Sequence, residues 1–317
     1  MKPSTLDRSI DWAVETGDRV IEIVFLGGEP TLEPMLIERA VQRAKLWESL
    51  LPIKFYFTMT SNFLNLDEGM IKKLARLNVS YLLSVDGYGE RHDVSRPAKT
   101  IASPFQLLME RIDTMKIYHP RMAARVTSTP KTVPYLEKDM TKLHEIGFNH
   151  FIISPATGIY WSDESINDYV EQVANFAINR KTLKGELIPT ITPIDDKPNG
   201  RASWGCGAGR GRFAVDPSGD IFSCARFAGL HNTDRLKLGD IYSGVDKMGN
   251  ILRFQDKSYY SRPGCLHCYI RERCLGGCPA INWEDTGSLT TPSPNECRTI
   301  KAMESIREKV YFKRHTC

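Results

Sequence analysis

The distribution of cysteines constrains this sequence more than any other feature. The first 205 residues contain none, and seven of the eight cysteines fall in one spaced array. The array reads Cys206-x12-Gly219-x4-Cys224, then Cys265-x2-Cys268-x5-Cys274-x3-Cys278, then Cys297. Thiolates this dense along short turns are typical of metal-sulfur centres, because each metal needs several ligands that only a tight loop can direct inward.

Iron-sulfur clusters, zinc ions and disulfides are the three explanations to compare. Disulfides are not expected, because bridges would be spread more evenly and are rare in a reducing compartment. Zinc is the alternative, since Cys-x2-Cys pairs bind zinc in many ribbons. Seven cysteines with gaps of five and three residues do not divide into two four-thiolate zinc sites, so the array favours iron-sulfur clusters. Two cuboidal clusters need eight thiolates; Cys317 is a candidate for the eighth, although it ends the chain, and His267 is expected to face solvent.

Composition and charge exclude several classes of function. The 317 residues are 41% hydrophobic and 25% charged, as in a soluble globular protein with one large and one smaller domain. The 42 basic and 38 acidic residues leave a net charge of +4 with no basic stripe, which argues against a nucleic-acid partner. Charges throughout the first 18 residues rule out a signal peptide there. No window approaches the roughly 20 apolar residues of a membrane span, so we expect a cytoplasmic protein with no membrane partner.

The cysteine-free part alternates between predicted strands and predicted helices. Runs of β-branched, aromatic and aliphatic residues predict five buried strands: 21–26, 53–58, 80–84, 123–127 and 150–153. Helical spacing of apolar residues predicts intervening helices: 35–47, 70–77 and 105–115. This alternation predicts an α/β fold with a parallel sheet that curls into an open or closed barrel, with ligands at the carboxyl ends of the strands.

The start of the chain predicts one more helix. Leu6, Ile10, Ala13 and Val14 fall on one helical face, and Ser4 is its expected N-cap. Far downstream, Pro189, Pro193 and Pro198 mark a composition shift that we interpret as a linker at 186–203. We therefore expect a core domain at 1–185 and a cysteine-rich domain at 204–317.

Polar groups gather after successive predicted strands. Gly27-Gly28-Glu29-Pro30 follows the first strand, where two glycines allow a ligand to approach the backbone and Glu29 would face a positive group. By itself this turn is better explained by a strand-to-helix connection with a Glu favoured at a helix N-terminus. Further polar residues follow the second and third strands and lie within the fourth: Ser61, Asn62, Ser84, Asp86 and Arg125.

Together these motifs resemble radical S-adenosylmethionine (radical SAM) enzymes with a C-terminal SPASM domain, of the peptide-maturase type. The resemblance rests on the Phe25–Pro30 turn, on Ser84–Gly87 with His92, Asp93 and Arg96 beyond it, and on the whole cysteine array. It implies a partial (βα) barrel of the radical SAM type followed by a small cysteine-rich iron-sulfur domain.

The resemblance also implies roles for individual residues. Gly27, Gly28 and Glu29 would hold the methionine amino group of S-adenosylmethionine. Ser61, Asn62, Ser84, Asp86 and Arg125 match less sharply, as contacts to its ribose or carboxylate, and ordinary turn or capping roles explain these five equally well. Two auxiliary clusters, expected to be [4Fe-4S], would divide the cysteines. Cys206, Cys224 and Cys278 would hold the first, and Cys265, Cys268, Cys274 and Cys297 would hold the second.

One departure from the family pattern affects the expected chemistry. The family holds its cleavage cluster on a Cys-x3-Cys-x2-Cys loop after the first barrel strand, and neither that motif nor that strand is found in this sequence. We expect that the chain as given cannot cleave S-adenosylmethionine. A fragment of a longer enzyme is the favoured explanation, and a natural product without radical chemistry is the alternative.

Two functions follow from the resemblance. The first is a radical SAM/SPASM maturase that modifies a peptide or protein, with a reductase or flavodoxin-type protein as electron donor. The second is a non-catalytic iron-sulfur module for electron transfer or peptide binding. Within the first, Ala225 stands where the sulfatase-maturating branch has a carboxylate after the second array cysteine, which disfavours that branch.

Overall fold

The computed structural model describes residues 1–180, 190–192, 207–209, 211–229, 236–245, 251–252, 262–274 and 276–315. The chain divides into two compact units that do not follow chain order. The first unit comprises Met1–Ile23, Glu33–Tyr56 and Lys197–Ile300, and the second comprises Val24–Leu32, Phe57–Asp196 and Lys301–Cys317. Most of the linker predicted at 186–203 lies outside the described residues, so the domain boundary stays a prediction.

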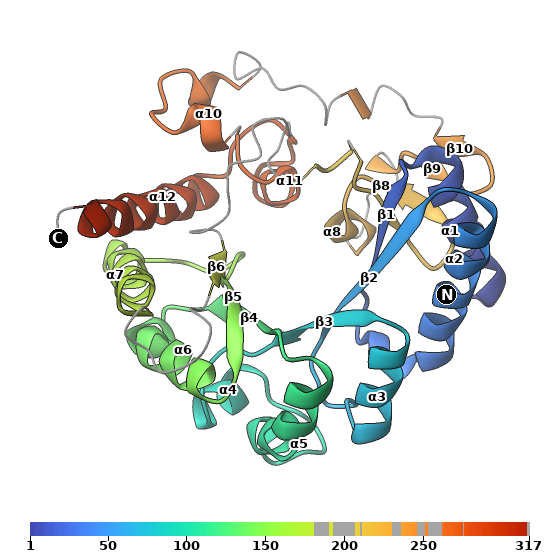
Figure 1. Ribbon diagram of the computed structural model, residues 1–317. Helices are drawn as coiled ribbons and strands as arrows, with labels where there is room; N and C mark the ends of the chain where they lie inside the picture. The colour runs from blue at the N-terminus through green and yellow to red at the C-terminus, as the bar shows by residue number, and fades with distance from the viewer. Residues whose placement is uncertain are drawn as a thin grey trace. The chain divides into compact units, whose positions relative to one another are not determined.

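The larger sheet has six strands in the same order in space as in sequence, β1 to β6 (Figure 1). The strands are β1 (Val20–Phe25), β2 (Lys54–Ser61), β3 (Val79–Ser84), β4 (Met122–Ser128), β5 (Phe148–Pro155) and β6 (Thr190–Thr192). Registered pairs from β2 through β6 are all parallel. All five predicted strands are confirmed, and so is the predicted α/β class.

The sixth strand was not predicted, because it lies within the predicted linker. Thr190–Thr192 pairs in parallel with His150–Ile152 of β5, and Ile191 is fully buried. The segment Thr-Ile-Thr has good β propensity, but three residues are too few for an alternation pattern to register.

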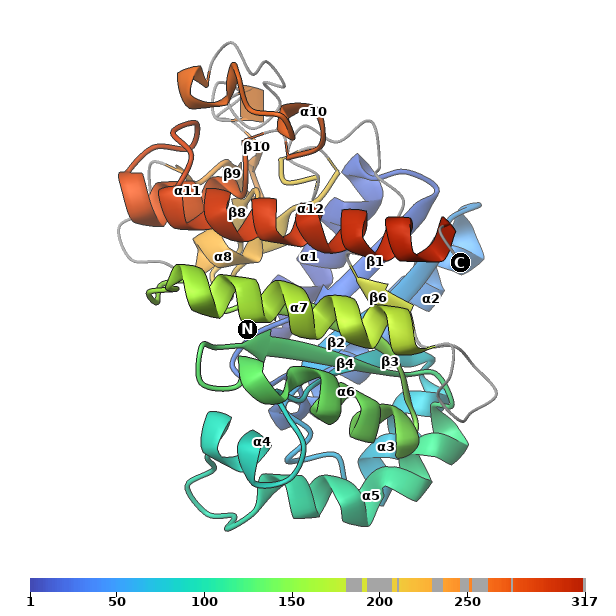
Figure 2. The ribbon, with the colours of Figure 1, turned by 90° about the vertical axis from the view of Figure 1, so that its left-hand side faces the viewer.

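Helices connect consecutive strands and lie outside them in Figure 1. Their bounds are α2 (Pro34–Leu50), α3 (Glu68–Arg76), α4 (Glu90–Ser95), α5 (Pro104–Tyr118), α6 (Leu136–Glu145) and α7 (Asp163–Asn179), with short 3-10 turns η1 (Pro30–Leu32) and η2 (Val133–Tyr135). Side chains cap three of them, since Asp67, Ser103 and Ser162 each accept a hydrogen bond from a backbone N–H in the first turn. Helices α6 and α7 lie side by side (Figure 2).

The strands alternate between a helix-facing side and a second side, as period-two strands should. In β4, Met122, Ala124 and Val126 are buried, whereas Arg125 between them is exposed. Residues of the second side, such as Arg125 and Thr127, are therefore free of the helix-packed core. The carboxyl ends of the parallel strands meet at one edge of the sheet, where ligands bind in folds of this type.

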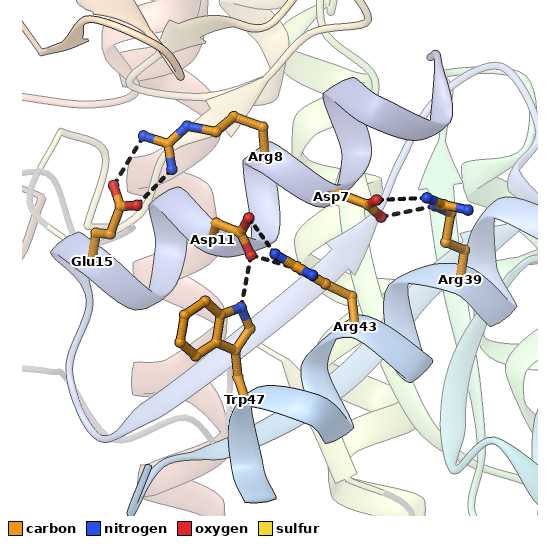
Figure 3. A network of polar contacts seen from close by, with 7 residues as sticks. All are labelled: Asp7, Arg8, Asp11, Glu15, Arg39, Arg43 and Trp47. Atoms are coloured by element: carbon orange, nitrogen blue, oxygen red, sulfur yellow. Dashed lines mark hydrogen bonds and ion pairs between the residues drawn. The ribbon is translucent and has the colours of Figure 1, made fainter. Parts of the chain in front are cut away.

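The first helix, α1 (Pro3–Thr16), is confirmed, but its predicted cap is wrong. The N-cap is Lys2, and Ser4 lies inside the helix. Pro3 at the first helical position explains the earlier start, because its fixed φ suits the first turn. Arginines of α2 fasten α1 through two bidentate pairs, Asp7–Arg39 and Asp11–Arg43, and Trp47 donates to Asp11 (Figure 3).

The cysteine-rich region contains a small antiparallel sheet and short helices. The sheet order is β10-β9-β8-β7, formed by β7 (Ala214–Val215), β8 (Asp220–Phe222), β9 (Gly239–Asp240) and β10 (Gly244–Val245). The helices are α8 (Ala225–Ala228), η6 (Pro263–Cys265), α10 (Arg271–Cys274), α11 (Pro279–Thr286) and α12 (Pro294–His315). The segment Asp216–Asp220 joins β7 to β8 in an antiparallel hairpin. Across the described helices, none is long and apolar enough to cross a membrane.

Candidate functional site

The Glu29 carboxylate joins the turn after β1 to the end of β2. Ser61 Oγ donates to Glu29 Oε1 at 2.8 Å, and the backbone N–H of Asn62 donates to Oε2 at 2.7 Å. Thr31 donates to Oε1 twice, from its backbone N–H at 3.1 Å and from Oγ1 at 2.6 Å. Three of the residues predicted to contact a cofactor, Glu29, Ser61 and Asn62, therefore lie together at the carboxyl edge of the sheet.

This carboxylate is fixed in orientation but keeps room for a ligand. Oε1 receives three hydrogen bonds and Oε2 only one, and a carboxylate oxygen can accept about two. Next to it, a Cβ built on Gly27 or Gly28 would meet no atom within 4 Å, and neither glycine has a positive φ. Packing within the described residues therefore gives no reason for glycine at these two positions, whereas close approach of a ligand does.

Asp86, another predicted contact, is held by the protein itself. Its carboxylate is buried and accepts from Arg96 Nε at 2.6 Å and from the backbone N–H of Thr127 at 2.7 Å. These contacts tie the end of β3 to the end of β4. Ser84 is buried two residues earlier and pairs in register with Arg125, whose side chain is exposed. The structure brings Ser84, Asp86 and Arg125 to the same edge on neighbouring strands.

His92 completes the support of Asp86. The backbone N–H of Asp86 donates to His92 Nδ1 at 3.3 Å, so this ring nitrogen accepts and the imidazole is neutral. Burial lowers the pKa of His92 to about 4, and the nearby Asp86 carboxylate offsets only part of that effect. His92 therefore acts as a neutral hydrogen-bonding group near pH 7.

Six of the cysteines lie among the described residues, and no disulfide joins any two of them: Cys224, Cys265, Cys268, Cys274, Cys278 and Cys297. Cys206 and Cys317 lie outside the described residues. Short turns connect the clustered members. The N–H of Cys268 donates to the carbonyl of Cys265 at 3.1 Å, and the N–H of Cys274 donates to Ile270 at 2.9 Å. His267 between the first two is exposed, as expected.

The three-residue gap between Cys274 and Cys278 depends on a glycine. Gly276 has a φ of +93°, and a Cβ there would lie 2.4 Å from Cδ of the buried Arg262. Buried Asn282 then fastens this loop, because its Nδ2 donates to the carbonyl of Gly276 at 2.9 Å and its Oδ1 accepts from Ser293 at 2.9 Å. The segments carrying Cys274, Cys278 and Cys297 are thereby joined.

Electrostatics place three thiols of the second predicted set close together. Burial raises the pKa of Cys274 to about 11, hydrogen bonds from the Gly276 and Gly277 backbone oppose the rise, and the neighbouring Cys297 and Cys265 thiolates add to it. Such a thiol is deprotonated readily only when a cation binds it.

Thiolates are the usual ligands of iron-sulfur clusters, in which each thiolate binds a different iron and the ligands stand apart. Among the residues that the structure describes, no three His, Cys, Asp or Glu side chains converge on one metal-ion position.

Sequence reasoning missed several supporting residues of these sites. Thr31 follows Glu29 by two positions, and a hydroxyl residue after an acid at a helix start is its only signal. Asn282 and Glu296 gave no signal. Glu296 precedes Cys297, and burial raises its pKa to about 7 although Arg226 lowers it. Arg226 also pairs with Glu284. This hydrogen bond raises the pKa of Arg226, and the nearby Cys278 thiolate adds to the effect.

No protein-family model matches the chain. A sequence relationship is nevertheless present over 311 residues, at 20% identity, with the radical SAM cyclopropyl synthase TigE of Paramaledivibacter caminithermalis. This chain is similar in sequence to a radical SAM enzyme over most of its length. The alignment covers 94% of this chain and 62% of TigE, so the chain spans less than two thirds of that relative. An uncharacterized protein of Methanocaldococcus jannaschii, MJ0907, is 27% identical over 143 residues, which are 45% of this chain and 49% of that protein.

Solved structures agree with the radical SAM relationship at the level of fold. The structure of anSMEcpe with bound AdoMet matches with a TM-score of 0.76 at 17% identity, covering 99% of this chain and 89% of that one. Streptococcus suis SuiB bound to S-adenosylmethionine matches with a TM-score of 0.58 at 16% identity, covering 94% and 70%. SuiB bound to its precursor peptide SuiA gives a TM-score of 0.60. The predicted fold, a partial radical SAM barrel followed by a cysteine-rich region, is confirmed.

Proposed function

We propose that this chain is part of a radical SAM/SPASM maturase that modifies a peptide or protein. The observation that carries the proposal is the Glu29 carboxylate, which four donors orient beside the two open glycines. The amino group of S-adenosylmethionine would donate to Glu29 Oε2, the oxygen with acceptor capacity left. Gly27 and Gly28 would let the methionine part approach the backbone, and Ser84, Asp86 and Arg125 would face its carboxylate and ribose.

Binding of S-adenosylmethionine to anaerobically purified chain tests this assignment. Gly28→Ala places a methyl group in space that is open in the protein, so we expect unchanged thermal stability but at least about tenfold weaker binding. Glu29→Gln should weaken binding by a similar factor, since it removes a charge-assisted hydrogen bond. Glu68→Gln, at an exposed carboxylate on α3, is the control. Equal affinity of Gly28→Ala, Glu29→Gln and the unchanged protein would reject the assignment.

For the cysteines we propose two auxiliary [4Fe-4S] clusters. Cys206, Cys224 and Cys278 would hold the first, and Cys265, Cys268, Cys274 and Cys297 the second. When bound, such clusters supply one-electron transfer. The nearness of Cys274 to Cys265 and Cys297 supports the second set. Reconstituted protein should contain iron and acid-labile sulfide, and Cys274→Ser should lower both by about half. Zinc without sulfide would overturn the proposal.

The 317 residues contain no Cys-x3-Cys-x2-Cys motif. In radical SAM enzymes the cluster on that motif supplies the reductive cleavage of S-adenosylmethionine. We therefore expect no 5′-deoxyadenosine above the protein-free blank from a chain limited to these residues. Release of 5′-deoxyadenosine would contradict this expectation.

A peptide or protein substrate is supported by relatives. Structures of anSMEcpe contain the peptide Kp18Cys, and SuiB was solved with precursor peptide SuiA. For this chain we propose a peptide partner of the same kind, together with a reductase or flavodoxin-type electron donor. The cytoplasmic location stays a prediction from the sequence.

A further inference from the structure

Helix α1 packs against the cysteine-rich region as well as against α2. Thr5 and Trp12, seven residues apart on one helical face, are both buried. Thr5 Cγ2 lies 3.6 Å from the position of a Cβ on Gly219, in the hairpin of the cysteine-rich region. The Trp12 ring meets Phe213 edge-on, with centroids 5.7 Å apart and planes at 86°. This face of α1 therefore contacts the β7–β8 hairpin, within the first compact unit.

Trp12 is the sole member from outside the cysteine-rich region in one described hydrophobic core. The core joins buried residues of the small sheet, the helices α8 and α11, and the segments between them: Ile221, Phe222, Phe227, Leu236, Leu238, Ile241, Ile251, Ala280 and Leu289. Such interiors are packed as densely as organic crystals, so a missing indole is not replaced by small shifts of its neighbours.

Two of the array cysteines pack against this core, and both belong to the same predicted set. Cys224 and Cys278 are partly buried and contact it. Cys224 is the N-cap of α8, and Cys278 is the N-cap of α11, so the two helices that start at these thiols are anchored in the core by Phe227 and Ala280. In the described part of the chain, the thiols of the second set are not among the core's contacts.

We infer that Trp12 is a positioning residue for the first auxiliary-cluster site and fixes Cys224 relative to Cys278. The inference rests on the proposed function for the identity of the group that these thiols bind. The statement that Trp12 fixes the positions of the two thiols holds whichever group they bind. Helix α1, which precedes the strand leading to the Glu29 turn, is then a structural part of the cysteine-rich module.

The role belongs to the ring and not to its N–H. Trp12 Nε1 is buried and has no hydrogen-bond partner among the described residues. A buried donor without a partner is destabilising. Phenylalanine keeps most of the apolar ring and removes that donor, so Trp12→Phe should preserve the positions of both cysteines.

Thiol alkylation of the metal-free chain of 317 residues tests the inference. Iodoacetamide modification of each cysteine is followed over time by peptide mass spectrometry for the unchanged protein, Trp12→Ala and Trp12→Phe. We expect Trp12→Ala to raise the alkylation rates of Cys224 and Cys278 by at least about tenfold relative to Cys265 and Cys297. Trp12→Phe should match the unchanged protein within about twofold. Trp161→Ala, which removes a buried tryptophan of the second unit, is the matched control and should leave the ratio unchanged.

If Trp12→Ala fails to fold, a second variant, Phe213→Leu, tests the inference in its place. Phe213→Leu removes the edge-on partner of Trp12 and should produce the same selective rise at a smaller amplitude. A uniform rise at all cysteines in folded Phe213→Leu, or no rise in folded Trp12→Ala, would overturn the inference. After reconstitution, Trp12→Ala should retain about half of the iron of the unchanged protein. If the unchanged protein takes up no iron and sulfide, the proposed function fails while the alkylation result still decides the role of Trp12.

Discussion

Arg96 Nε donates to Asp86 Oδ2 at 2.6 Å, and this contact joins a helix-terminal residue to the end of strand β3. The Arg96 side chain is 34% exposed and that of Asp86 only 7%. Removing the arginine would leave the buried Asp86 carboxylate with one of its two partners described above, the Thr127 N–H. The pair therefore holds the polar edge of the sheet in shape.

Arg96→Ala should destabilise the fold by about 2 kcal/mol, because an uncompensated buried charge is costly although partial exposure of the arginine reduces the effect. Urea unfolding followed by circular dichroism measures the change. Lys142→Ala is the control, since its pair with Glu145 is about half exposed on both sides. That change should leave the stability almost unchanged, because an exposed ion pair contributes little. Equal effects of the two substitutions would contradict the buried role of Asp86.

Stability should fall on acidification because of His92. Its folded-state pKa of about 4 lies below the ordinary 6.5, so the folded state favours the neutral ring. The contribution is complete above pH 6.5 and is lost as the pH falls toward 4, amounting to about 3 kcal/mol. The free energy of unfolding, measured between pH 7 and pH 4, should depend on pH less steeply in His92→Phe. His267→Gln, at an exposed histidine, should keep the original slope.

The charged contacts between α1 and α2 should differ in their contribution. Burial would raise the pKa of Asp11, but hydrogen bonds from Arg43 and Trp47 outweigh it and leave the pKa lowered (Figure 3). Asp11→Ala should cost about 1–2 kcal/mol, because the Asp11 side chain is 17% exposed and loses three hydrogen bonds. Glu15→Ala breaks a more exposed pair with Arg8 and should destabilise the protein less than Asp11→Ala does. Thermal unfolding at low and high salt would show whether this order is wrong.

Replacement by alanine should destabilise the protein at one glycine of the cysteine loops and be tolerated at another. Gly276→Ala combines a positive φ with a Cβ 2.4 Å from Arg262 Cδ, so we expect at least about 2 kcal/mol of destabilisation and reduced iron uptake. Gly264→Ala meets nothing within 4 Å, although it directly precedes Cys265, and should be tolerated. Iron content per chain after reconstitution compares the two. Similar uptake by both variants would show that the Gly276 conformation is not needed.

Local features were predictable because their signals are local. The strands from β1 to β5 followed from runs of β-branched and aromatic residues. Strand β6 was missed because Thr190–Thr192 is too short for a periodic signal. The predicted Ser4 cap was wrong because the helix already starts at Pro3.

The sequence by itself determined which chemistry is available: a cysteine array with cluster spacing and a Gly-Gly-Glu turn after a strand. Tertiary structure alone decided which of these groups meet. Ser61 reaches Glu29 across 32 positions, and Trp12 meets Phe213 across about 200, because parallel strand pairing and core packing bring them together. Such contacts depend on shape complementarity between distant segments, which leaves no periodic trace in either segment.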